Sequence, residues 1–113
     1  MHEVGIMQAA LEQAIASAQA DQATRIHVIR LRVGALSGVV PEALEFAFTV
    51  VRAGTMAAEA ILEIEPVPLR YWCPRCADEF TGDGLSTLCP RCHSPSPDIR
   101  AGRELEVASL EVS

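Results

Sequence analysis

The chain has 113 residues and a formal net charge of −6, from 9 basic and 15 acidic side chains. Half of the residues are hydrophobic but only 4% are aromatic, so we expect an aliphatic core in one small domain, with or without a metal-held module. The acidic balance argues against nucleic acid and against an anionic membrane surface as partners. No apolar run reaches the roughly 18 residues of a membrane span, and no secretory signal pattern is present, so a cytoplasmic protein is expected.

The first half of the chain predicts a helix, a strand and a second helix. Apolar residues at helical intervals predict a first helix from Val4 to Gln22. The segment from Arg25 to Val33 alternates apolar residues with Arg30 and Arg32, as a half-buried strand does. Apolar residues at helical spacing then follow Pro41, and proline is favoured at the first position of a helix.

Two further strands are predicted in the second half. In the segment from Ile61 to Leu69, Glu63 and Glu65 point outward and are expected to face two arginines of the first strand across the sheet. In the segment from Glu104 to Val112 the apolar residues move from odd to even positions, which a bulge near Ala108 would explain. A cysteine-rich segment separates these strands, so we expect a module inserted into one sheet.

Two CxxC segments, which we call knuckles, carry all four cysteines of the chain. The first is Cys73-Pro74-Arg75-Cys76, and twelve residues later the second is Cys89-Pro90-Arg91-Cys92. Two residues between thiolates let one loop present both sulfurs to a metal, and two such pairs at this spacing are typical of a four-thiolate zinc site. Arg75 and Arg91 could offset the negative charge of such a site. The module holds no amphipathic element in its sequence, so metal binding is expected to supply its folding free energy.

Other interpretations of the knuckles remain. Disulfides do not suit a reducing compartment, and a thioredoxin-like redox pair would use one CxxC at the start of a helix. An iron site of the rubredoxin type is the main rival to zinc. Glycine often follows each knuckle in such proteins, whereas Ala77 and His93 stand here. His93 is expected to be an exposed turn residue, with a spare metal ligand as the alternative.

The first three residues, Met1-His2-Glu3, place an α-amine, two backbone amides and an imidazole close together. Such nitrogen ligands in a plane suit Ni²⁺ and also Cu²⁺. By itself the pattern is weak evidence, because most histidines at position 2 belong to an ordinary exposed terminus, and Glu3 is also a residue type that begins helices.

Several segments in order along the chain carry a more specific signal. They are Met1-His2-Glu3, Arg32 to Val39, Pro41 to Leu44, Phe46-Ala47-Phe48, Leu62 to Glu65, the two knuckles, Gly102 to Leu105, and Ser109 to Val112. Together they closely resemble the HypA/HybF family, the nickel-insertion factors of [NiFe]-hydrogenase maturation. The resemblance runs nearly from end to end.

The resemblance implies an α+β fold, with two helices packed on a three-stranded mixed β-sheet and a zinc-ribbon module inserted before the last strand. It implies a nickel-binding domain of residues 1–70 plus 99–113 and a zinc-ribbon domain of residues 71–98. Some family members carry a histidine beside each knuckle. In this chain only His93 does so, because Trp72 precedes the first cysteine.

The resemblance also implies ligands and partners. Nickel would be held by nitrogens of Met1, His2 and Glu3, and zinc by Cys73, Cys76, Cys89 and Cys92. The partners would be a HypB-type nickel GTPase and the hydrogenase large subunit, with urease accessory proteins as further partners in some members.

We therefore expect a metallochaperone and not an enzyme, since no nucleophile with a base and no phosphate-binding loop is found in the sequence. Two alternatives belong to other classes. One is a zinc-ribbon interaction module of the transcription or translation machinery, which the acidic charge disfavours. The other is a rubredoxin-like electron carrier, which would contain iron.

Overall fold

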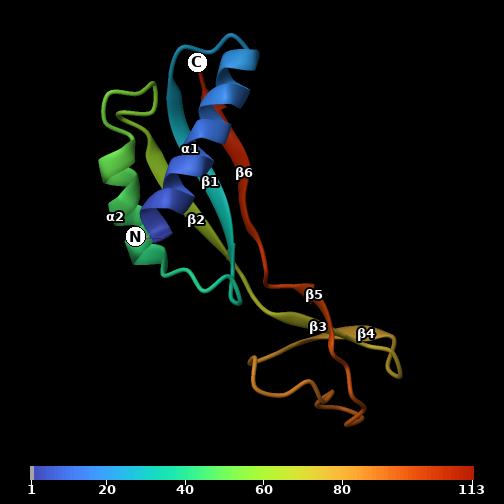
Figure 1. Ribbon diagram of the computed structural model, residues 1–113. Coiled ribbons are helices and arrows are strands. Elements are labelled where there is room, and N and C mark those ends of the chain that lie inside the picture. The colour runs from blue at the N-terminus through green and yellow to red at the C-terminus, as the bar shows by residue number, and fades with distance from the viewer. Residues whose placement is uncertain (1) are drawn as a thin grey trace. The chain divides into compact units, whose positions relative to one another are not determined.

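The computed structural model describes residues 2–113, which form two compact units that we consider separately (Figure 1). The helical unit comprises the described residues up to Arg32, Val39–Glu65 and Glu106–Ser113. The ribbon unit comprises Val33–Gly38 and Pro66–Leu105. The expected ribbon of residues 71–98 thus lies within a unit that is longer at both ends. The expected α+β fold is confirmed, with two helices and two three-stranded sheets.

Two helices lie in the helical unit. Helix α1 spans His2–Ala20, two residues earlier at each end than predicted, and Gln22 beyond it has a φ of 61° that no helix can continue. Helix α2 spans Pro41–Val51 and begins at the predicted proline. The residues that the helices bury recur every three or four positions. They are Met7, Leu11, Ala14 and Ala18 on α1, and Leu44, Ala47 and Phe48 on α2.

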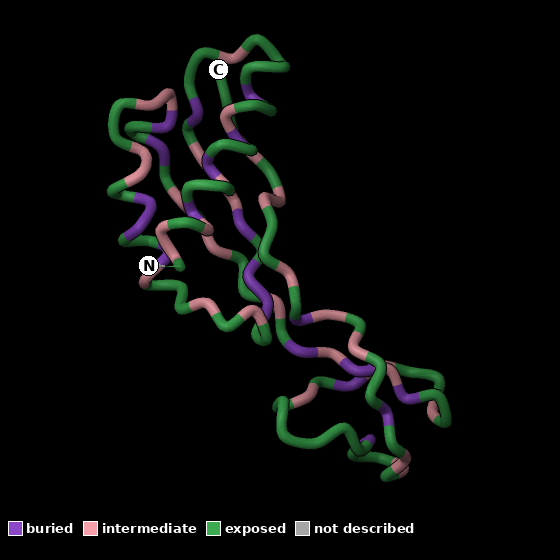
Figure 2. Tube along the Cα trace, viewed as in Figure 1, coloured by how far each residue is buried: buried purple, intermediate pink, exposed green. Residues whose placement is uncertain are grey.

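The first sheet has the strand order β2–β1–β6, with β1 at Ile26–Gly34, β2 at Ile61–Val67 and β6 at Leu105–Val112. The main chains of Arg25 and Ser113 exchange hydrogen bonds of 3.2 and 3.0 Å, so β6 runs antiparallel to β1. The buried side chains of β1 include Ile26, Ile29 and Leu31. Figure 2 shows the buried positions concentrated on β1 and on the helices that cover the sheet.

Charged side chains line the sheet as predicted. Arg30 Nε donates to Glu63 Oε2 at 2.8 Å, and Arg32 Nε lies 3.3 Å from Glu65 Oε2. Because both pairs advance by two residues in the same direction, β1 and β2 run parallel, and the expected mixed sheet is found.

The same two arginines also reach β6 on the other side. Arg30 contacts Glu111, and Arg32 Nη1 lies 3.5 Å from Glu106 Oε1. These two glutamates are five residues apart and would face opposite sides of a regular strand. Their common side requires a change of parity between them, while the bulge near Ala108 itself stays a prediction.

The ribbon unit corrects one expectation. It contains strands β3 at Arg70–Cys73, β4 at Asp78–Thr81 and β5 at Asp98–Ala101, in the order β4–β3–β5 with antiparallel pairing. The prediction that this module holds no amphipathic element was wrong, because β3 alternates between a buried and a less buried face. Four-residue strands are too short to show their period in the sequence.

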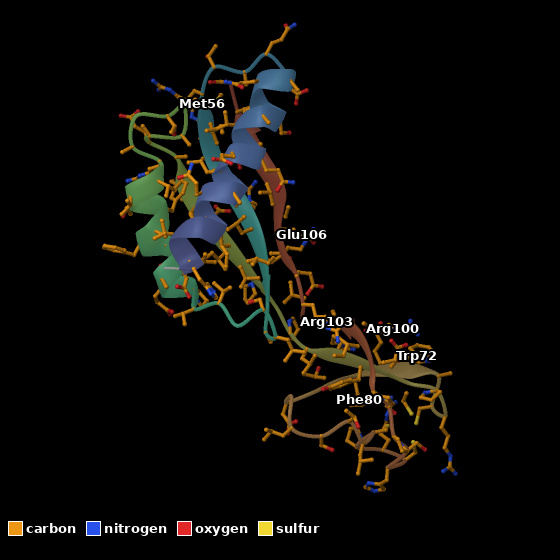
Figure 3. All side chains as sticks on the ribbon, viewed as in Figure 1. Met56, Trp72, Phe80, Arg100, Arg103 and Glu106 are labelled. Atoms are coloured by element: carbon orange, nitrogen blue, oxygen red, sulfur yellow. The ribbon has the colours of Figure 1, made fainter. Side chains whose placement is uncertain are left out.

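A small core belongs to this second sheet. Its buried members are Leu69, Tyr71, Cys73, Phe80 and Cys89. The rings of Tyr71 and Phe80 stack with centroids 5.4 Å apart. On the opposite face of β3, the Arg100 guanidinium lies 4.7 Å from the centre of the Trp72 ring (Figure 3). Two of the core residues are cysteines, so the core and the candidate metal site share two side chains.

Within the described part of the chain, neither helix is long and apolar enough to cross a membrane.

Candidate metal centre

The first knuckle forms the turn between two strands. Cys73 is the last residue of β3 and pairs with Asp78, the first residue of β4. The backbone N–H of Cys76 lies within this turn and donates to Cys73 Sγ at 3.3 Å. Ala77 then adopts a φ of 52° to bring the chain into β4. The hairpin therefore holds two sulfurs on one side of the turn.

The second knuckle is closed by main-chain hydrogen bonds. The Cys89 N–H donates to the Ser94 carbonyl at 3.0 Å, and the His93 N–H donates to the Cys89 carbonyl at 2.8 Å. His93 has a φ of 61°, so it repeats the left-handed conformation that Ala77 adopts after the first knuckle. These are the two positions at which glycine often follows a knuckle in other proteins. The knuckle geometry is thus kept without glycine, at some cost in backbone strain.

The four sulfurs converge. Those of Cys73, Cys76, Cys89 and Cys92 all lie within 4.8 Å of one another. Cys73 Sγ and Cys92 Sγ are 3.5 Å apart, and Cys76 Sγ and Cys89 Sγ are 3.9 Å apart. All four cysteines are free, which excludes disulfides in this structure. Four sulfurs at the Zn–S bond length of about 2.3 Å would be separated by about 3.8 Å in a tetrahedron, so the donor set fits zinc.

The four thiols differ in acidity. The backbone N–H of Cys76, followed by the Ser96 hydroxyl, lowers the pKa of Cys73 to about 6 despite burial. The side chain and N–H of Ser94 lower the pKa of Cys92. Cys76 is surrounded by other sulfurs, with Cys92 the largest influence, and its pKa is raised to about 12. Hydrogen-bond donors therefore favour the thiolate form at two of the four sulfurs, as a metal requires.

Ser96 is a residue of this site that sequence reasoning missed. It is fully buried, and its hydroxyl oxygen lies 3.0 Å from the Ser94 carbonyl oxygen, so its one proton is shared between that carbonyl and the Cys73 sulfur. Its N–H donates to the Thr87 carbonyl at 2.8 Å, which ties the segment after the second knuckle to the segment before it. The surrounding Ser-Pro-Ser-Pro sequence looks like an ordinary loop, so no local signal distinguishes this serine.

The two knuckle arginines behave differently. Arg91 Nη1 lies 3.3 Å from Asp78 Oδ2, and its pKa is raised chiefly by Asp78 and further by Cys76 and Cys89. Arg91 therefore acts on the sulfur cluster as expected. Arg75 is exposed and has no ion pair with the residues that the structure describes. His93 is also exposed, and it is not among the groups that converge on the site.

The predicted nickel ligands are only partly described. Met1 lies outside the described residues. His2 is the first residue of α1 and is exposed, and its Nε2 lies 3.6 Å from Glu3 Oε2. The structure thus brings the four cysteines together, whereas the three-residue nickel set stays a prediction.

Comparisons with known proteins agree with this architecture. A sequence profile described as "Hydrogenase/urease nickel incorporation, metallochaperone, hypA" matches residues 1–112. A hydrogenase maturation factor HypA from a Picosynechococcus strain is 48% identical over 112 residues, covering 99% of each chain. The factor of the same name from Chloroflexus aurantiacus is 42% identical and covers 98% of each chain.

Solved structures show the same similarity. The solution structure of the Ni metallochaperone HypA from Helicobacter pylori superposes with a TM-score of 0.70 at 25% identity, over 97% of this chain and 96% of that one. A second solution structure of HypA gives a TM-score of 0.75 at 26% identity, over 100% of this chain and 97% of that one. The chain therefore belongs to the HypA family, the metallochaperones that incorporate nickel during hydrogenase maturation.

Proposed function

We propose that this chain binds Ni(II) through nitrogens of Met1, His2 and Glu3 and transfers it toward [NiFe]-hydrogenase. The observation that carries the proposal is the family match over residues 1–112, which includes this tripeptide. The direct recipient would be a HypB-type nickel GTPase or the hydrogenase large subunit. The family description also names urease, so urease accessory proteins are a second class of partner to test.

The start of α1 supports this ligand set. The first four N–H groups of a helix have no acceptor within the helix, so the amides of His2 and Glu3 are available for other bonds. The positive end of the helix dipole also favours amide nitrogens that have lost a proton to the metal. The Nε2 of His2 faces the Glu3 carboxylate, which leaves Nδ1, the nitrogen nearer the main chain, for the ion.

We assign zinc a structural role in the ribbon unit, with Cys73, Cys76, Cys89 and Cys92 as its ligands. Bound zinc would cross-link the two knuckles and add free energy of folding, which reaches about 10–16 kcal/mol in zinc-finger peptides. The Arg91 guanidinium would offset part of the negative charge of the four thiolates. Iron at the same four sulfurs is the alternative, and it would favour an electron carrier.

Nickel transfer by this chain would be ligand exchange and not catalysis. An ion on an exposed terminus can be reached by a competing ligand, and the chain would supply access and selectivity. We place this activity in the cytoplasm, where the thiols of the ribbon stay reduced.

The test is nickel titration of the untagged protein beside two variants. His2→Ala should abolish tight nickel binding, and one residue added before Met1 should do the same, because each removes or displaces a ligand. Zinc content should not change. His27→Ala is the matched control, since this exposed histidine of β1 bonds to Ser113 at 2.8 Å and should leave nickel affinity intact. Nickel affinity that survives His2→Ala would place the site elsewhere.

A second experiment tests delivery in the cell. A strain that carries His2→Ala should accumulate hydrogenase large subunit without nickel, and excess nickel in the medium should partly restore activity. Full activity of this strain at trace nickel would refute the metallochaperone role. Loss of activity that nickel does not restore would favour a docking role for the terminus.

A further inference from the structure

The charges of the helical unit are distributed unequally between its two layers. The arginines of the central strand are paired on the sheet, where Arg30 and Arg32 each contact two glutamates. Neither helix contains an arginine or lysine within its bounds, and among the described residues the one adjoining cationic side chain is Arg52 at the C-cap of α2. The carboxylates of Glu42 and Glu45 on α2 have no ion pair or hydrogen bond with the residues that the structure describes. The helical layer therefore carries negative charge that the chain itself does not balance.

The same helix exposes apolar side chains beside these carboxylates. Phe46 is 65% exposed and Val50 is 55% exposed, and their spacing of four residues places them on one face of α2. The other two phenylalanines of the chain, Phe48 and Phe80, are buried. We call Glu42, Glu45, Phe46 and Val50 the α2 outer face. A single exposed leucine needs no explanation, but phenylalanine is enriched at the centres of protein interfaces, so an exposed Phe46 favours an interface here.

The α2 outer face lies in the helical layer, and helix α1 of the same layer begins at the proposed nickel ligands. Helices α1 and α2 pack against each other, and Figure 1 shows both starting at the same end of the layer. A protein that covers the start of α2 would therefore come close to His2.

We propose that the α2 outer face docks a basic surface of the protein that exchanges nickel with this chain. Phe46 would enter an apolar recess of the partner, and arginine or lysine side chains around the recess would pair with Glu42 and Glu45. Charge complementarity selects this occupant, because a second copy of the acidic helical layer would be repelled. The inference rests on the proposed function, which supplies a nickel-handling partner.

The test uses the purified HypB-type GTPase of the same organism and the full-length chain. Phe46→Ala should weaken binding about tenfold or more, as loss of a central aromatic does. Ile61→Ala is the matched control, because Ile61 is 61% exposed on β2 of the same unit, in the sheet and not on a helix. This control should bind like the parent.

A charge variant tests the second part of the proposal. Glu42→Gln with Glu45→Gln should slow association and reduce the dependence of affinity on salt. Val50→Ala removes the second apolar side chain of the α2 outer face and tests its share of the binding. The circular dichroism spectrum of each variant should match that of the parent, since all of these side chains are exposed.

The outcomes separate this inference from the proposed function. If Phe46→Ala binds the GTPase like the parent, or if the parent does not bind it at all, the docking proposal is wrong. If Ile61→Ala is the weaker binder, the sheet and not α2 is the interface. Nickel titration of Phe46→Ala should match the parent in every case, so failure of docking leaves the nickel site untouched.

Discussion

The α-carbon of Gly34 lies against the main chain of Gly102. A Cβ at Gly34 would stand 2.2 Å from the Gly102 carbonyl oxygen, far inside van der Waals contact. The two segments are joined by hydrogen bonds of 2.7 Å from the Gly34 N–H to the Glu104 carbonyl and from the Leu36 N–H to the Gly102 carbonyl. Two segments of the HypA-like pattern, far apart in the sequence, thus form one junction in the ribbon unit.

We expect Gly34→Ala to destabilise the protein. The added methyl group meets backbone atoms that cannot rotate away, and overpacking of this kind costs roughly 1–3 kcal/mol. Chemical denaturation of the zinc-loaded protein measures the loss. Gly5→Ala is the control, since a Cβ there meets nothing within 4 Å, and this helix position should gain roughly 0.5–1 kcal/mol. If Gly34→Ala and Gly5→Ala are equally stable, the close contact between Gly34 and Gly102 is wrong.

We expect Cys73→Ala to abolish stoichiometric zinc binding and to unfold the ribbon sheet. The side chain supplies a sulfur of the cluster and also part of the small core, so both are lost together. Elemental analysis and the dispersion of amide NMR signals measure the two effects. His93→Ala should retain one zinc per chain, because His93 lies outside the sulfur cluster. Red protein with stoichiometric iron in the parent would overturn the zinc assignment.

We expect zinc binding to weaken as the pH falls, because protons compete with the metal for all four thiolates. The pKa of Cys73 is lowered to about 6, so at neutral pH this sulfur is a thiolate and zinc displaces no proton from it. A pKa lowered from 9.0 to about 6 stabilises the folded ribbon in full above about pH 9, and this contribution is lost as the pH falls from there to about 6. Release of zinc to a chromophoric chelator at stepwise lower pH measures the midpoint. Complete release at neutral pH would contradict the environment described for Cys73.

We expect nickel to leave at a higher pH than zinc. The proposed nickel ligands include an α-amine and backbone amides, which bind only after losing protons that the metal itself must displace. Calorimetry in buffers of different ionisation enthalpy measures the protons released on binding. Nickel affinity that stays constant while the pH falls far enough to release zinc would argue against this ligand set.

The helices, the first sheet and its charge pairs could be predicted from the sequence. Each depends on a period that repeats over seven or more residues, such as the buried positions of α1 or the alternation around Arg30 and Arg32. The glutamates of β2 have the same alternation, so opposite charges on neighbouring strands could be paired before the structure was known. The metal site at the knuckles could be predicted equally well, since two CxxC pairs at this spacing occur in few kinds of site.

Only the tertiary structure shows how the interior of the ribbon unit is built and that Gly34 packs against Gly102. Strands β3, β4 and β5 have four residues each, too few to show a period, and β5 joins β3 from a distant part of the chain. The burial of Ser96 beside Cys73 and the contact of Gly34 with Gly102 arise in the same way. Local sequence encodes periodicity and turn chemistry, whereas a contact between segments that lie far apart exists only once the chain has folded.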